Sequence, residues 1–163
     1  MRRLVLLLAL TVVAVACVDS GGGGTTTDEL ELFVRQDVAP YESFIGSPFN
    51  WGGDRLGNDP SGPPVSHPNI EARWTDVNVQ QDARKITWKG GAGQFYIQAA
   101  EADLRPYLNS DAAIVWDTII TKAPTQRTVI SAHCVFPCFS DAPITKVLAD
   151  RADGAKHTIK VPV

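Results

Sequence analysis

The stretch RKITWKGGAGQFYIQ, residues 84–98, contains two short apolar and polar patterns on either side of a glycine-rich turn. In the second pattern Phe95 and Ile97 alternate with three polar or amphipathic side chains, Gln94, Tyr96 and Gln98. A period of two residues indicates a β-strand with one buried face, and the glycines at positions 90, 91 and 93 mark a turn. The stretch therefore predicts two strands with a turn between them.

The same period recurs along most of the chain. It is found in residues 30–34, where Leu30, Leu32 and Val34 are expected to share a face, and again in EARWTDVNV (71–79), DAAIVWDTII (111–120), residues 130–134 and HTIKVPV (157–163). Helical periodicity is confined to DLRPYL (103–108) and TKVLADRA (145–152), and Asp141 is expected to cap the second of these. Seven or more short strands in one chain predict an all-β protein, an antiparallel β-sandwich.

One long segment keeps no period. Residues 41–68 are rich in Gly, Pro, Asn and Ser. A loop of that length inside a compact domain is uncommon and is usually functional or disordered. We therefore expect residues 41–68 to be an irregular loop that carries function.

The N-terminus has the layout of an export signal. Two arginines precede an apolar run of about 12 residues, which is too short to span a membrane, and small residues lead to Cys17. AVAC (14–17) resembles the lipobox of bacterial lipoproteins, in which the cysteine is acylated; the alternative is an ordinary signal peptide cut near Ala16. We predict a signal peptide over 1–16, a flexible Gly- and Thr-rich tether over 17–28 and one domain over 29–163.

These boundaries predict a location at the cell envelope, with the membrane contacted only through the lipid on Cys17. In an organism with two membranes, Val18 favours the outer membrane or the periplasmic face. Without Arg2 and Arg3 the chain has 13 basic and 18 acidic residues, a formal charge of −5. Nucleic acid is therefore excluded as a partner, since its binding depends on neutralising phosphates.

With Cys17 assigned to the lipid, the remaining cysteines are Cys134 and Cys138. In an oxidising compartment the pair favours a disulfide, which closes a small loop and is worth about 2 kcal/mol. A metal site that uses the adjacent His133, or two free thiols, are the alternatives. The spacing differs from the Cys-x-x-Cys of redox proteins.

Several motifs, taken in order, are similar to those of one known family. They are Gln80, Asp82, Ala83 and Trp88 in the pattern Gln-x-Asp-Ala-x-x-x-x-Trp, the strand Ile114–Asp117, the cysteine pair, and the final Ile-x-Val-Pro. Together they resemble the ExoP-type galactose-binding-like domain at the C-terminus of bacterial family-three glycoside hydrolases, which are exo-β-glucanases and β-glucosidases. The resemblance implies a jelly-roll sandwich that serves as a carbohydrate-binding-like accessory module.

A glycan site needs an aromatic ring for the apolar face of a sugar and polar groups for its hydroxyls. The candidate residues for carbohydrate binding are Trp51, Asp54, Arg55, Gln94, Tyr96 and Gln98. Trp74, Trp88 and Trp116 lie in strand patterns and are expected to support the core, and Gln80 and Asp82 are expected to stabilise a turn.

The function predicted from the sequence is a non-catalytic, lipid-anchored module that binds a β-glucan-type polysaccharide or oligosaccharide. No pair of carboxylates and no nucleophile motif indicates an enzyme, so catalytic residues are predicted to be none. No metal site or cofactor is predicted, although many galactose-binding-like domains hold a structural calcium ion and the sequence leaves that open. The alternative is an envelope lipoprotein that binds or stabilises another protein, without a glycan ligand. A glycoside hydrolase or another envelope protein is the candidate partner.

Overall fold

The computed structural model describes residues 6–8, 30–48, 50–77, 82–99, 112–133 and 139–162. Several predicted features lie outside these ranges: the lipid-bearing Cys17, the tether, the cysteine pair 134 and 138, Gln80 and the segment DLRPYL. The predicted signal peptide also lies outside them, except for Leu6–Leu8.

The described residues form short strands and one brief helix. The strands are β1 (Leu6–Leu8), β2 (Phe33–Val34), β3 (Gln36–Asp37), β4 (Glu42–Gly46), β5 (Asp54–Arg55), β6 (Val65–His67), β7 (Ile70–Thr75), β8 (Ala83–Trp88), β9 (Gln94–Gln98), β10 (Ala113–Ile120), β11 (Val129–His133), β12 (Phe139–Pro143) and β13 (Lys156–Pro162), and the helix is α1 (Thr145–Ala149).

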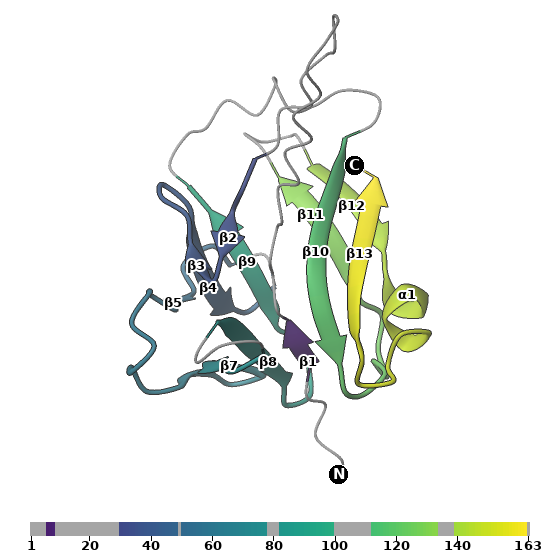
Figure 1. The fold of residues 1–163 in the computed structure, drawn as a ribbon, viewed down its shortest axis with the longest axis horizontal. Coiled ribbons are helices and arrows are strands. Elements are labelled where there is room, and N and C mark those ends of the chain that lie inside the picture. The colour runs from purple at the N-terminus through teal and green to yellow at the C-terminus, as the bar shows by residue number, and fades with distance from the viewer. Residues whose placement is uncertain are drawn as a thin grey trace, which may run out of the picture.

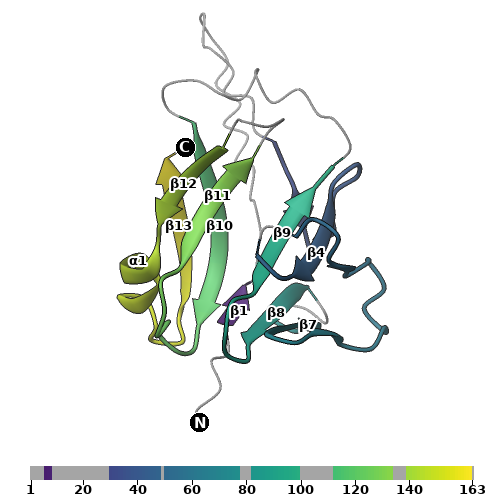
Figure 2. The ribbon, with the colours of Figure 1, turned by 180° about the vertical axis from the view of Figure 1, so that it is seen from behind.

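These strands form the two layers of an antiparallel sandwich. One layer is a six-stranded sheet in the order β13-β10-β1-β8-β7-β6, and every ladder in it is antiparallel. The three-stranded sheet β5-β4-β9 and the hairpin β11-β12 lie against it, as the two opposite views in Figures 1 and 2 show. The structure is therefore the all-β fold that the period of two predicts.

Two apolar clusters fill the space between the layers. The first contains Trp116, Ile120 and Ile159 of the large sheet, and Ile144 and Leu148 at α1 close it from the other side. The second cluster joins Ile70, Ala72 and Ile86 of the large sheet to Ile45 and Leu56 near the small one. Trp88 packs against both clusters.

The prediction that Leu30, Leu32 and Val34 share the buried face of one strand is wrong. Phe33 is fully buried whereas Val34 is exposed. The chain reverses between β2 and β3 at Arg35, whose φ is +60°, instead of continuing as one strand. Phe33 then packs 6.4 Å from the Trp74 ring, measured between centroids, and this contact outweighs the local pattern.

The prediction that residues 41–68 form an irregular loop is also wrong. This segment contains β4, β5 and β6, and β4 is the central strand of the small sheet. Ser43 and Ile45 point inward and are fully buried. A buried serine interrupts the apolar pattern, so this strand is hard to recognise from sequence.

The predicted helix at TKVLADRA is present as α1, but Asp141 does not cap it. Asp141 lies on β12, where its carboxylate accepts a hydrogen bond from the Ser131 hydroxyl. Ile144 occupies the N-cap position and contributes no side-chain hydrogen bond. Within the described ranges, no helix is both long and apolar enough to cross a membrane.

Candidate functional site

The outward face of the small sheet carries a group of aromatic and polar side chains. Residues directly opposite each other in an antiparallel pair project to the same side. The register sets Phe44 opposite both Tyr96 and Arg55, and Glu42 opposite Gln98. Their inward neighbours Ser43 and Ile45 face the core. We call the surface formed by Phe44, Trp51, Tyr96, Glu42, Arg55 and Gln98 the aromatic face.

Three rings are in contact on the aromatic face. Phe44 and Tyr96 stack with their centroids 5.3 Å apart and their planes 9° from parallel. Trp51 stands nearly perpendicular to Tyr96, at 87° and 5.2 Å, and meets the His133 ring on β11 at 67° and 4.9 Å. Trp51 still exposes 46% of its surface. Its ring is thus held between two neighbours while almost half of it remains accessible.

Hydrogen bonds from β9 hold the segment that carries Trp51. The Gly53 N–H donates to the Tyr96 hydroxyl at 3.0 Å, and the Gln94 side-chain amide donates to the Asn50 carbonyl at 3.0 Å. The Asn50 side chain accepts from the Gly52 N–H at 3.1 Å. Trp51 therefore lies in a short turn fixed from both sides.

A charged pair lies beside the rings. Arg55 on β5 forms an ion pair and hydrogen bond with Glu42 on β4, and both side chains are well exposed. Asp54 lies opposite Ile45 in the register, so it belongs to the other side of the sheet from Arg55. The aromatic face thus offers a guanidinium group, a carboxylate and the Gln98 amide close to its rings.

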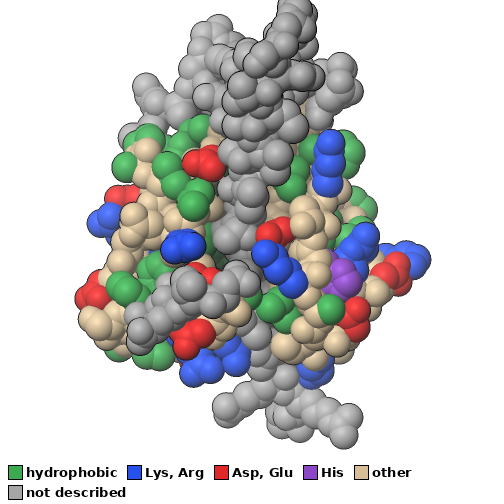
Figure 3. Space-filling model, in the orientation of Figure 1, with side chains coloured by type: hydrophobic (Ala, Val, Ile, Leu, Met, Phe, Trp, Pro, Cys, Tyr) green, Lys and Arg blue, Asp and Glu red, His purple; other side chains and the backbone are tan. Residues whose placement is uncertain are grey.

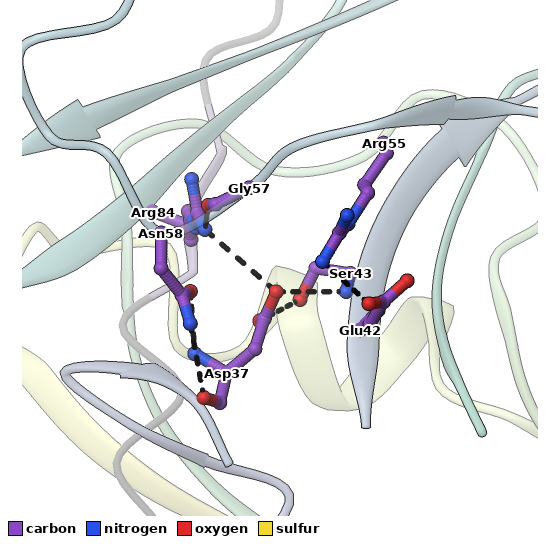
Figure 4. A network of polar contacts seen from close by, with 7 residues as sticks. All are labelled: Asp37, Glu42, Ser43, Arg55, Gly57, Asn58 and Arg84. Carbon is purple, nitrogen blue, oxygen red and sulfur yellow. Dashed lines mark hydrogen bonds and ion pairs between the residues drawn. The ribbon is translucent and has the colours of Figure 1, made fainter. Parts of the chain in front are cut away.

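A buried polar network fixes β4 beneath this face. The Asp37 carboxylate accepts from the Ser43 backbone N–H at 2.9 Å and from the Ser43 hydroxyl. Asn58 bonds the Asp37 backbone in both directions, at 2.9 and 3.2 Å. Figure 4 shows Asp37 surrounded by these partners, with Arg55 and Glu42 as a separate pair.

Arg84 on β8 completes the network. Its guanidinium group donates to the Gly57 carbonyl, lies 3.9 Å from the Asp37 carboxylate and is stacked 3.7 Å from the centre of the Trp74 ring. Burial lowers the pKa of Arg84 to about 10, and the nearby Asp37 charge opposes that shift. Arg84 is therefore still charged at neutral pH, and its charge is balanced by Asp37 and by the ring.

The structure brings together five of the six residues predicted to bind carbohydrate. Trp51, Arg55, Gln94, Tyr96 and Gln98 lie on or beside the aromatic face, and Asp54 does not. Gln94 and Tyr96 also orient the Trp51 segment, a role that was not predicted from the sequence. Tyr96 is itself buried, at 9% exposure, so its ring supports Trp51 and offers little surface of its own.

The other tryptophans and the predicted turn residue lie where they were expected. Trp116 is buried in the first cluster, Trp88 packs against both clusters, and Trp74 is half-buried beside Arg84. The Asp82 carboxylate accepts from the Val77 N–H at 2.7 Å and so holds a turn.

Three residues of the site were missed. Phe44 and Glu42 belong to the unrecognised strand β4, whose burial alternates although its sequence, ESFIG (42–46), does not alternate between apolar and polar residues. His133 was considered only as a metal ligand, yet its ring contacts Trp51. No local signal predicts that contact, because the two residues are far apart in sequence.

The described residues contain no group of three or more His, Cys, Asp or Glu side chains arranged to hold a metal ion. What they do contain is an antiparallel sandwich with an aromatic surface on its smaller sheet, which is the general form of a carbohydrate-binding-type module. A family model described as galactose-binding domain-like, of the ExoP C-terminal type, matches residues 39–163.

The chain therefore belongs to this galactose-binding domain-like family. Domains of this kind are generally non-catalytic accessory modules that bind carbohydrate. Neither the curated proteins nor the solved structures provide a match to the chain.

Proposed function

We propose that the aromatic face binds a β-glucan-type polysaccharide, with Trp51 as the ring against which a sugar unit packs. The observation that carries this proposal is the position of Trp51, which is exposed at 46% but held by contacts with Tyr96 and His133. A rigid ring loses little conformational entropy on binding, so its contact area converts efficiently into affinity.

The polar groups around Trp51 suit sugar hydroxyls. Arg55 and Glu42 supply donors and acceptors on one side, and the register places Gln98 directly opposite Glu42. The aromatic face therefore carries one cation and one anion side by side, which supports a neutral glycan in preference to a strongly charged one.

The surroundings of Trp51 also argue for sugar over a protein partner. Among the described residues, the large hydrophobic side chains that are exposed are Val34 and Trp51. Protein interfaces usually need a contiguous apolar patch, whereas a sugar subsite needs one ring. In the cell, the same proposal places the module at the envelope, anchored by lipid on Cys17, where it holds polysaccharide for a partner glycoside hydrolase.

The test is a calorimetric titration of the full chain with β-1,3- and β-1,4-gluco-oligosaccharides, in a detergent that contains no sugar headgroup. We expect saturable binding that falls at least about tenfold in Trp51→Ala, which corresponds to about 1.4 kcal/mol. Val34→Ala, the other exposed large hydrophobic position, is the matched control and should bind normally.

Circular dichroism of each variant separates lost binding from lost folding. Equal binding by wild type and Trp51→Ala would disprove the role of the ring. If a folded wild-type chain binds none of the glycans, the glycan proposal fails and interaction with an envelope protein becomes the proposed function.

A further inference from the structure

The N-terminal strand β1 lies in the middle of the large sheet. Leu6–Leu8 pairs with β8 on one side and with β10 on the other, antiparallel to both. Figure 1 shows β1 between these two strands. Because β1 is antiparallel to each neighbour, β8 and β10 run parallel to one another about 10 Å apart, two strand spacings, and do not pair directly.

The position of β1 coincides with the boundary between the two apolar clusters. The register sets Leu6 opposite Ile86 on β8 and Ile120 on β10. Ile120 belongs to the first cluster and Ile86 to the second, and both are fully buried. Without β1, the large sheet would consist of the pair β13-β10 and the separate set β8-β7-β6.

The strand edges on either side of β1 have the character of a binding site for an extended segment. Backbone N–H and C=O groups that lose their partners at a strand edge readily pair with another strand. The positions opposite β1 are Ile86, Lys85 and Arg84 on β8, and Ile120 and Ile119 on β10, so the two isoleucines opposite Leu6 form the apolar end of the site and the two cations lie at its other end. An occupant must therefore be short, extended and uncharged where it meets Ile86 and Ile120.

We propose that the space between β8 and β10 is a strand-acceptor site, and that its occupant in the unprocessed chain is that chain's own N-terminal apolar segment. The segment then has two functions, as an export leader and as the strand that joins the two halves of the large sheet. Cleavage before Cys17 would remove the occupant and leave the site open to another strand of the same chemistry.

The test measures hydrogen exchange by mass spectrometry in the full chain carrying Cys17→Ser, which blocks lipidation and the linked cleavage. Leu7→Pro removes a backbone N–H at the centre of β1 and cannot be accommodated between two strands. We expect residues 83–88 and 113–120 to exchange faster by about tenfold or more, and residues 42–46 and 94–98 to be unchanged.

Thr11→Pro is the matched control, since it places a proline in the same apolar run but beyond the C-terminal end of β1. It should leave the exchange of residues 83–88 and 113–120 as in the parent chain. The proposal is overturned if Leu7→Pro leaves that exchange unaltered, or if Thr11→Pro increases it equally. Neither result depends on whether the protein binds a glycan.

Discussion

Gly53 determines where Trp51 lies. A β-carbon built at Gly53 would be 2.4 Å from the Ile45 carbonyl oxygen and 2.9 Å from the Tyr96 hydroxyl. Both distances are shorter than real contacts of such a carbon, and the closer one involves backbone that cannot rotate away. Glycine at this position is what allows the turn to approach β4 and to donate its N–H to Tyr96.

We therefore predict that Gly53→Ala displaces the turn and weakens glycan binding by about tenfold, with a loss of about 1–3 kcal/mol in unfolding free energy. Calorimetric titration and urea denaturation measure the two effects. Gly62→Ala is the control, because a β-carbon there meets only the Asp59 carbonyl oxygen, at 3.1 Å, and neither residue belongs to the aromatic face or to the turn that carries Trp51. If both variants bind as wild type does, the close approach of Gly53 does not position Trp51.

At the scale of an element, the inward residues of β4 contribute to stability and its outward residues contribute to the aromatic face. Ile45 points inward to the second cluster, whereas Phe44 points outward and stacks on Tyr96. The two side chains are adjacent in sequence but belong to different environments, so their substitutions should have different consequences.

We predict that Ile45→Ala lowers the unfolding free energy by about 2–5 kcal/mol, because it leaves a cavity in a fully buried site. The folded fraction should bind glycan with an affinity within about twofold of wild type. Phe44→Ala should weaken binding more than Ile45→Ala does, because it removes the ring that supports Tyr96. Urea denaturation, together with titration at a temperature where each variant is folded, measures both quantities. The same loss of affinity in both variants would contradict this division.

The elements also show what sequence could and could not predict. β13 was predicted because its alternation is regular and its buried residues, Ile159 and Val161, are apolar. β8, β9 and β10 were predicted from their apolar residues, although Arg84 on β8 and Asp117 and Thr118 on β10 are buried as well. β4 was missed because one of its two inward positions is Ser43, whose burial depends on a hydrogen bond to Asp37. Such a partner is known only once the chain has folded, and local periodicity carries no information about it.

The candidate site was predictable to a similar extent. Residue chemistry indicated Trp51 and Arg55, and strand alternation put Gln94, Tyr96 and Gln98 on one face. Neither residue chemistry nor strand alternation could indicate that His133 contacts Trp51, or that Asp54 lies on the other side of the sheet. Both facts depend on how strands distant in sequence pair and pack.

At the scale of the whole molecule, charge is balanced and spread out. The chain has 15 basic and 18 acidic residues, a formal charge of −3, and Figure 3 shows the two signs interspersed on the face it displays. Long-range attraction of a charged polymer is weak for such a surface, and interactions between exposed charges are screened within about 10 Å at 0.1 M salt.

We predict that glycan affinity changes by less than about twofold between 0.05 and 0.5 M sodium chloride, because ring contacts and hydrogen bonds to neutral hydroxyls do not depend on ion release. Titration across that range of salt is the measurement, with an acidic polysaccharide as the comparison ligand. A steep fall in affinity with salt would instead show that the ligand is an anionic polymer.

Trp88 contacts both apolar clusters, and its indole N–H donates to the Gly93 carbonyl at 3.0 Å. One side chain thus touches the interior of each half of the sandwich. Its indole resonance in an NMR spectrum should shift when either half loosens, so a single natural probe can follow the integrity of the complete domain without any label.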